Sequence, residues 1–167
     1  EMHVEERRVN WEILDAWREA AEEIGIPKID EFNRGDNFGN AYFQMNQHRG
    51  RRWSATKAFL KPAINRKNLK VMTRTQVTRI IISNNRAIGV ELVSNHNSRK
   101  ILRGRREIII AAGTVGSPQL LELSGIGETD LLKNAGVQPV HHLPGVGENL
   151  QDHLQIRSIY KVKNTSP

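Results

Sequence analysis

The stretch that decides the fold is residues 113–127, GTVGSPQLLELSGIG, which follows the apolar run IIIAA at residues 108–112. Three isoleucines followed by alanine and glycine predict a buried strand over residues 106–111, which ends where the backbone passes close to another group. We expect a helix to follow, with Ser117 as its cap and Pro118 in its first turn. Gly125 would end this helix. Its apolar face would consist of Leu120, Leu121 and Leu123.

A strand, a glycine turn and a helix N-terminus together favour a bound anion such as phosphate, because unpaired N–H groups and the helix dipole point at it. The order of Gly-Ser-Pro, a leucine-rich turn and Ser-Gly-Ile-Gly is more particular, and it resembles the second signature of the glucose–methanol–choline (GMC) flavin oxidoreductases. The segments on either side also resemble this family, and the likeness covers nearly the whole chain. These segments are NAYFQ at 40–44, RRWSA at 51–55 and GVGENLQDH at 145–153.

The resemblance is nearest to the bacterial choline dehydrogenase and alcohol dehydrogenase branch, and it implies an internal part of a longer protein. The fold class that it implies is α/β, a partial FAD-binding doubly wound domain with an antiparallel β-meander, plus parts of a substrate-binding domain. Residues 1–66 would be a helical and loop region next to the substrate domain. Residues 67–153 would belong to the FAD-binding domain, and residues 154–167 would start the substrate-domain sheet.

Hydrophobic periodicity and turn residues predict the other elements. Helices are expected at 7–24, from Ser54 to about 65, and from Thr129 to Gly136 with Leu131, Leu132 and Ala135 inward. Loops or turns are expected at 33–40, 83–86 and 94–98. Strands or extended pieces are expected at 41–45, 69–73, 75–82, 87–93, 100–103, 137–143 and 155–162.

The resemblance implies an enzyme that oxidises an alcohol or choline to an aldehyde, with hydride transfer to flavin N5. In this family the base is a histidine near the C-terminus, and no histidine here matches that motif, so no residue of the chain is assigned a catalytic role. The substrate is expected to be a small primary alcohol, aliphatic or choline-like. A quaternary ammonium would need an aromatic cage and a carboxylate, and the sequence offers Trp53, Tyr42 and Phe43 without an acid nearby. The electron acceptor stays open between a quinone, oxygen and another acceptor.

Four positions match residues that contact FAD in the family. Val77 matches the residue whose backbone meets the adenine, and Ala112 and Gly113 match the strand end beside the adenosine and diphosphate. Asn149 matches a position where the family closes over the flavin. The alternatives from the residues alone are an ordinary strand residue, a glycine turn that starts a helix, and a loop cap. The chain by itself is expected to hold FAD weakly and to catalyse nothing.

The net charge of +7 is unevenly distributed, since no Asp or Glu occurs between Asn37 and Glu91. Three interpretations stay open: a nucleic-acid surface, a field that attracts an anionic cofactor, and a solvated face balanced by acids elsewhere. A basic nucleic-acid-binding module without activity is thus the alternative function. We do not expect it, because aromatic residues are not interleaved with the cations. The cations are Arg49, Arg51, Arg52, Lys57, Lys61, Arg66, Lys67, Lys70, Arg74, Arg79 and Arg86.

The sequence contains no cysteine, which excludes disulfides and thiolate metal sites. His141, His142 and His153 do not suggest a metal site, because adjacent residues on an extended chain point to opposite faces and no histidine pair has a helical ligand spacing. No apolar run approaches the roughly 20 residues of a membrane span. The compartment stays open, with the cytoplasm or the periphery of the inner membrane expected.

Overall fold

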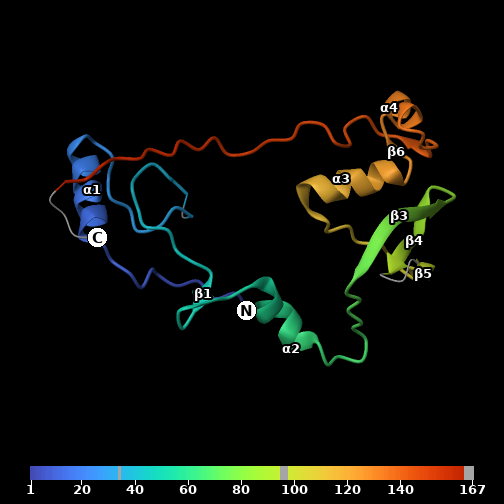
Figure 1. The fold of residues 1–167 in the computed structure, drawn as a ribbon, viewed down its shortest axis with the longest axis horizontal. Helices are drawn as coiled ribbons and strands as arrows, with labels where there is room; N and C mark the ends of the chain where they lie inside the picture. The colour runs from blue at the N-terminus through green and yellow to red at the C-terminus, as the bar shows by residue number, and fades with distance from the viewer. Residues whose placement is uncertain (34, 95–97, 164–167) are drawn as a thin grey trace. The chain divides into compact units, whose positions relative to one another are not determined.

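The computed structural model describes residues 1–33, 35–94 and 98–163, which divide into two units. Unit 1 consists of Glu1–Val71 and the described part of Arg157–Pro167, and unit 2 consists of Met72–Ile156 (Figure 1). The turn predicted at residues 94–98 and the loop predicted at 33–40 lie partly outside the described residues.

Unit 1 begins with an extended segment that pairs with a later one, and its first helix follows. Glu5 and Met45 exchange backbone hydrogen bonds of 3.0 and 2.9 Å, so the chain before the helix is held in an extended form. Helix α1 therefore covers Glu12–Glu23 instead of beginning at residue 7. It ends where predicted, at Gly25, whose φ is +90°.

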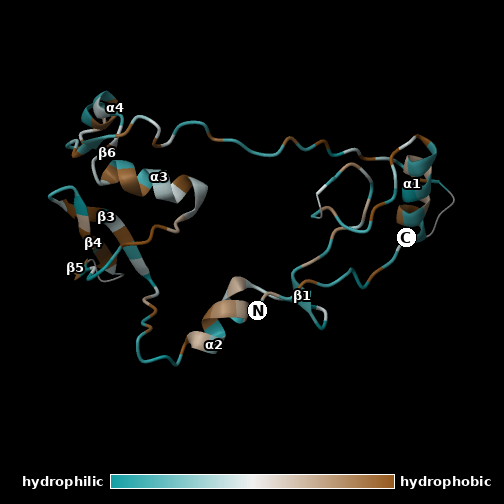
Figure 2. Ribbon diagram, turned by 180° about the vertical axis from the view of Figure 1, so that it is seen from behind, coloured by the Kyte–Doolittle hydropathy of each residue, from teal (hydrophilic) through white to brown (hydrophobic). Residues whose placement is uncertain are grey.

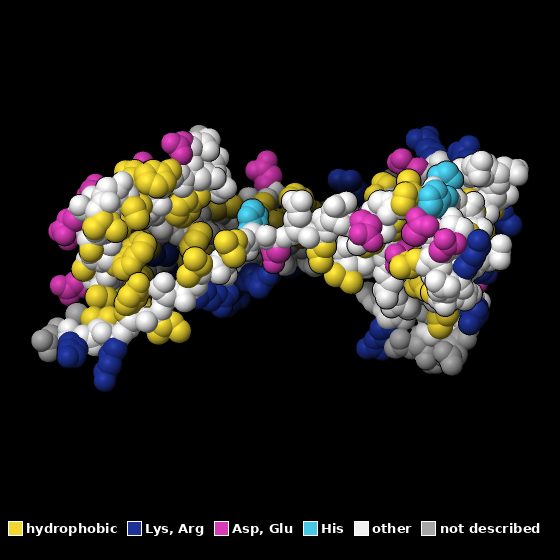
Figure 3. Space-filling view, turned by 90° about the horizontal axis from the view of Figure 1, so that it is seen from above, with side chains coloured by type: hydrophobic (Ala, Val, Ile, Leu, Met, Phe, Trp, Pro, Cys, Tyr) yellow, Lys and Arg dark blue, Asp and Glu magenta, His cyan; other side chains and the backbone are white. Residues whose placement is uncertain are grey.

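The rest of unit 1 is a short hairpin followed by a short helical segment. Strands β1 (Gln47–His48) and β2 (Arg51–Arg52) are antiparallel. A helical segment starts next to Ser54, as predicted, as the π-helical turn η1 (Thr56–Leu60), and continues as α2 (Lys61–Ala63). Among the described residues of this unit, only Ala21 and Ala58 are buried apolar residues, and Figure 3 shows many hydrophobic side chains on its surface.

Unit 2 is built on a three-stranded antiparallel meander, which confirms the prediction for this region. Its strands are β3 (Thr75–Ser83), β4 (Arg86–Ser94) and β5 (Arg99–Arg103), in the order β3-β4-β5. Asn84 and Asn85 connect β3 to β4 with φ of +50° and +57°, the two left-handed residues that suit a tight hairpin between twisted strands. In this sheet β3 has β4 on one side and no described strand on the other, so β3 is an edge strand.

Helix α3 (Gly113–Leu123) lies beside this sheet (Figure 1). The prediction of Ser117 as its cap is wrong, because Gly113, at φ +82°, turns the chain directly into the helix and Ala112 is the capping residue. Pro118 lies inside the helix, where it removes one backbone hydrogen bond. The predicted end at Gly125 is confirmed by its φ of +83°. Of the predicted apolar face, Leu123 is 50% exposed, and the other two leucines are half-buried.

The strand predicted over residues 106–111 is absent from the described structure, and Ile109 is 79% exposed. The reason is that a strand needs a neighbouring strand to bond its N–H and C=O groups. No described segment pairs with residues 106–111. The strands predicted at 69–73 and 155–162 are likewise not formed in the described chain.

Unit 2 ends in a small parallel pair with a short helix between its strands. Strand β6 (Ile126–Gly127) pairs with β7 (His141–His142), so the extended piece predicted at 137–143 is confirmed only at these two residues. Helix α4 (Thr129–Asn134) is capped by the side chain of Glu128 rather than by Thr129. Its Leu132 is 1% exposed, whereas Leu131 and Ala135 point outward, contrary to the prediction.

The core of unit 2 is contributed by the meander and α4. Its buried apolar side chains are Ile80, Leu92 and Leu132. Figure 2 shows the hydrophobic residues concentrated in β3, β4 and α3. Helix α3 thus lies beside the meander, next to its edge strand β3.

Candidate functional site

A cleft of 340 Å³ lies between β3 and α3, and we call it the β3–α3 cleft. It brings together two of the predicted cofactor residues, Val77 on β3 and Ala112 at the start of α3. It is lined by Thr75, Gln76, Val77, Ala112, Gly116, Gln119, Leu120 and Leu123. Residues far apart in the sequence thus share one site because α3 runs along the edge strand.

The β3–α3 cleft has a neutral lining with hydrogen-bonding side chains on both β3 and α3. None of its lining residues is charged. The Gln76 amide donates from Nε2 to the Val77 carbonyl oxygen at 3.2 Å, so a polar side chain lies directly beside the backbone of Val77. A Cβ on Gly116 would come within 3.2 Å of the Ala112 Cβ, so glycine keeps this part of the cleft open. The chemistry suits a flat, neutral heterocycle better than a phosphate.

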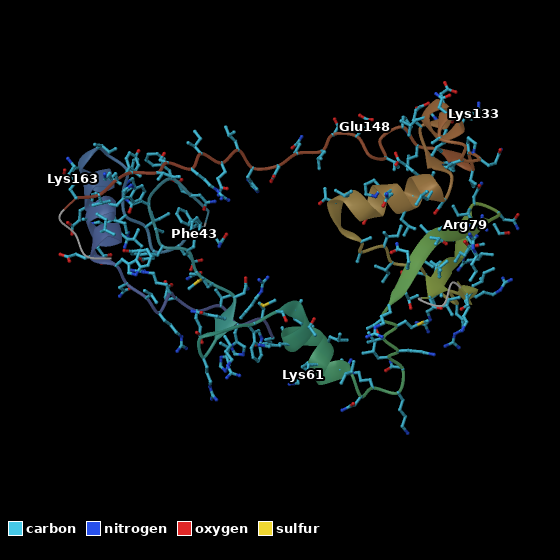
Figure 4. The ribbon with its side chains drawn as sticks, viewed as in Figure 1. Phe43, Lys61, Arg79, Lys133, Glu148 and Lys163 are labelled. Carbon is cyan, nitrogen blue, oxygen red and sulfur yellow. The ribbon has the colours of Figure 1, made fainter. Side chains whose placement is uncertain are left out.

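A second cleft of 480 Å³ lies on another face of α3, and we call it the α3–loop cleft. Its helix side includes Glu122, and its loop side includes Asn149, whose φ is +56°. Figure 4 shows the neighbouring Glu148 on the segment that follows β7. Gly147 has a φ of +81°, which favours glycine, and a Cβ there would lie 3.1 Å from Glu122 Oε1, so the loop approaches the helix closely at this point. Asn149 is therefore separated from Val77 and Ala112 by α3, and Gln119 lines both clefts.

Gly113, the fourth predicted residue, lies at the start of α3 beside Ala112. No atom lies within 4 Å of the position that a Cβ would take there. Its φ of +82° nevertheless favours glycine. The backbone at the N-terminus of α3 is consequently open to close approach by a ligand. This agrees with a role for Gly113 in shaping the turn.

The sequence analysis missed Ser124 as a residue that shapes this site. It is 7% exposed, and its Oγ accepts a hydrogen bond from the Ile80 N–H at 2.8 Å. In the sequence it appears only as part of a helix stop. The available signal was a small hydroxyl residue directly before the glycine that ends an apolar helix.

Glu91 on β4 is a buried carboxylate with three hydrogen-bonding or charged partners. The hydrogen bond from Thr78, the hydrogen bond and charge of Arg79 and the charge of Arg99 outweigh burial and hold the pKa of Glu91 below its ordinary value. Arg79 is on β3 (Figure 4). Its Nη2 lies 3.1 Å from Oε2 of Glu91 on the neighbouring strand. Glu91 lines neither of the two clefts, so its role is in holding the sheet.

The three aromatic residues considered for a choline cage do not come together in unit 1. Trp53 packs against His3 and His48, with ring centroids 4.9 and 5.1 Å away. Phe43 packs against Phe32, with 5.4 Å between centroids.

Tyr42 is the aromatic residue that has an acid beside it, contrary to the sequence expectation. Its hydroxyl donates to the Asp15 carboxylate, and burial together with this bond raises the pKa of Tyr42. The guanidinium groups of Arg7 and Arg18 lie over its ring. The ring therefore already has cations against it, and it is not available to a trimethylammonium group.

The described residues contain no group of three or more His, Asp or Glu side chains arranged to hold a metal ion. Within the same residues, no helix combines the length and apolarity that crossing a bilayer requires. His142 is instead hydrogen-bonded through Nδ1 to Thr129 Oγ1 at 2.9 Å.

Comparison with known proteins identifies the family. Residues 1–155 match the sequence profile described as GMC oxidoreductase. The chain belongs to the GMC oxidoreductase family. It is 43% identical over 155 residues to the mitochondrial choline dehydrogenase of Homo sapiens, covering 93% of this chain and 26% of that protein. It is 40% identical over 144 residues to the oxygen-dependent choline dehydrogenase of Staphylococcus saprophyticus, covering 86% and 25%. This GMC chain thus spans about a quarter of the length of these relatives.

Solved structures show the same likeness in three dimensions. Pyridoxine 4-oxidase from Mesorbium loti superposes with a TM-score of 0.85 at 32% identity, over 91% of this chain and 30% of that one. A fungal aryl-alcohol oxidase has a TM-score of 0.85 at 30% identity, over 90% and 26%. These matches confirm the predicted fold class and family, and they favour the oxidoreductase interpretation of this GMC chain over a nucleic-acid-binding module.

Proposed function

We propose that this chain is the part of an FAD-dependent alcohol oxidoreductase that holds the adenosine side of the cofactor. The observation that supports it best is the β3–α3 cleft, where Val77 and Ala112 line one neutral space. Adenine is a flat, uncharged ring whose edge carries both donors and acceptors. The backbone of Val77 and the side-chain amides of Gln76 and Gln119, which all belong to residues lining the cleft, offer complementary groups.

The proposal gives each cofactor residue a separate task. The Val77 backbone meets the adenine, while Ala112 and Gly113 let the start of α3 approach the diphosphate. The free N–H groups and dipole at this helix end favour the negative charge. Asn149 lies in the α3–loop cleft and faces the flavin side of the cofactor. When bound, FAD supplies the hydride acceptor, and no residue of this chain is proposed to be catalytic.

We propose the following assignment of the chain to the domains of the enzyme. Residues 67–153 belong to the FAD-binding domain, residues 1–66 lie next to the substrate domain, and residues 154–167 begin its sheet. The uncharged lining of the β3–α3 cleft is consistent with a helix whose face toward β3 is covered inside a cofactor domain.

For the substrate, we propose a primary alcohol, with choline as the first compound to test. The named relatives at 40% and 43% identity are choline dehydrogenases. Because two guanidinium groups already lie over the Tyr42 ring, a trimethylammonium group would be recognised by residues other than Tyr42. Steady-state kcat/KM of the full-length enzyme on choline, medium-chain alcohols and sugars tests this. A strong preference for a sugar would defeat the proposal.

The cofactor site is tested with a matched pair of variants of the full-length enzyme. Ala112 and Ala135 are both exposed, and both cap a helix with similar backbone angles, φ −86° and ψ 8° against φ −81° and ψ 2°. Ala112→Leu places a bulky side chain in the β3–α3 cleft and should raise the Kd for FAD by about tenfold or more, the factor for 1.4 kcal/mol. Ala135→Leu should leave it unchanged. Equal FAD affinities in the two variants would show that the cleft is not the site.

A further inference from the structure

Ser124 joins the end of α3 to the middle of β3 through two hydrogen bonds. Its Oγ accepts from the Ile80 N–H at 2.8 Å, and it donates to the Leu120 carbonyl oxygen at 2.5 Å. The side chain is almost completely buried, with 7% of the residue exposed. A hydroxyl group suits this place because it can accept one bond and donate another at the same time.

The Ile80 N–H lies on the edge strand of the sheet. An N–H on such an edge has no neighbouring strand to accept its hydrogen bond, and at this point the Ser124 hydroxyl takes that role. Ile80 lies three residues after Val77 on β3. Ser124 is the C-terminal capping residue of α3, and Ala112 is the N-terminal capping residue of the same helix. The Ser124 side chain therefore fixes the position of the C-terminal end of α3 relative to β3.

Gly125 supports Ser124 from the other side. A Cβ on Gly125 would lie 2.5 Å from the Gln138 carbonyl oxygen and 2.8 Å from Val140 Cγ2. The Val140 N–H also donates to the Gly125 carbonyl oxygen at 2.7 Å. The turn that carries Ser124 is thus pressed between β3 and the segment before β7, and it has little room to shift.

We propose that Ser124 is a positioning residue for cofactor binding, because its hydrogen bonds hold α3 at the spacing from β3 that opens the β3–α3 cleft. This inference rests on the proposed function. Without the hydroxyl, the buried Ile80 N–H lacks an acceptor, a costly state that drives either a shift of the helix or entry of water. Either change alters the cleft between Val77 and Ala112. Binding then requires the protein to restore the spacing, and affinity falls.

The test measures the Kd for FAD of the full-length apoenzyme by flavin fluorescence. Ser124→Ala should raise this Kd by about tenfold, the factor that corresponds to one buried hydrogen bond. Ser124→Thr retains the hydroxyl and should restore most of the affinity.

Leu132→Val is the stability control, because it creates a small cavity around a side chain that is 1% exposed. It should lower the thermal midpoint without changing the Kd. If Ser124→Ala does not fold, Ser124→Cys takes its place, and its weaker hydrogen bonds should also raise the Kd.

Steady-state kinetics at saturating FAD distinguish a positioning role of Ser124 from a catalytic one. The saturated Ser124→Ala enzyme should keep the KM for alcohol and the kcat of the wild type, since the hydroxyl of Ser124 is bonded to Ile80 and Leu120 and is assigned no contact with substrate. An unchanged Kd in Ser124→Ala, or an equal loss of affinity in Leu132→Val, would overturn the inference. If the wild-type enzyme binds no FAD, or Ala112→Leu binds it normally, the proposed function fails instead.

Discussion

Glu91 on β4 accepts a hydrogen bond from Thr78 Oγ1 at 2.8 Å, and Arg79 Nη2 donates to its other oxygen at 3.1 Å. Successive side chains of a regular strand point to opposite faces. Here the register shifts between Val77 and Arg79, and such a bulge re-aims side chains. Two consecutive residues of β3 therefore reach one carboxylate, directly after the residue proposed to meet the adenine.

The first prediction is a dependence of stability on pH that comes from Glu91. Its pKa is lowered in the folded state below the ordinary 4.5, so its stabilisation is fully present above the unfolded pKa and is lost as the pH falls through the folded pKa. Glu91→Gln should therefore lower the thermal midpoint at neutral pH, and the difference from the wild type should shrink below pH 4.5.

The matched control for Glu91 is Glu107→Gln, which changes an exposed acid of the same unit. It should leave the midpoint unchanged at every pH. Midpoints of the full-length enzyme, measured by calorimetry at several pH values, provide the comparison. The prediction would be contradicted if the difference in thermal midpoint between Glu91→Gln and the wild type stayed constant down to about pH 3, which is about a unit or more below the ordinary pKa of a glutamate.

The second prediction separates backbone strain from steric overlap at two glycines. Gly125 and Gly136 have φ of +83° and +73°, so alanine is strained at both. A Cβ at Gly125 would also collide with the Gln138 carbonyl oxygen at 2.5 Å, whereas no atom lies within 4 Å at Gly136. Gly136→Ala should cost about 1 kcal/mol of unfolding free energy, and Gly125→Ala about 2–4 kcal/mol. Equal losses in chemical denaturation would refute the steric part of the argument.

The third prediction is that residues 1–167 alone retain little FAD and give no turnover on alcohols. They provide the proposed Val77 and Ala112 contacts with FAD in one cleft, but no histidine here matches the family's catalytic motif. The measurement is the flavin retained after desalting, together with dye reduction on alcohols. Stoichiometric yellow protein would show that the cofactor site is more complete in this segment than proposed.

The fourth prediction concerns aggregation of the same segment. Ile109 is 79% exposed, in an apolar run without a pairing strand among the described residues. Such a run is a template for association. Ile109→Lys should therefore increase the monomer fraction of residues 1–167 in size-exclusion chromatography. Lys100→Arg, a change at an exposed cation of β5, is the control and should have no effect.

Local sequence patterns were sufficient wherever the interactions that form an element are themselves local. The β3–β4 hairpin was predictable because alternating apolar residues flank two asparagines that accept positive φ. Gly25, Gly125 and Gly136 marked helix ends for the same reason. The GMC signature identified the family and the fold class. Which residues contact FAD remains a prediction from that resemblance.

Only the tertiary structure decided which distant residues lie together and which apolar runs find partners. Residues 106–111 have the composition of a buried strand, but strand formation depends on a neighbour that no local pattern can supply, and none lies among the described residues. The side-by-side packing of β3 and α3 placed Val77 and Ala112 in one cleft and Asn149 in another. It also gave Ser124 its role, because a hydrogen bond between Ile80 and Ser124 joins residues that are 44 positions apart in the sequence. Such a contact is set by the packing of whole elements, which residue propensities do not encode.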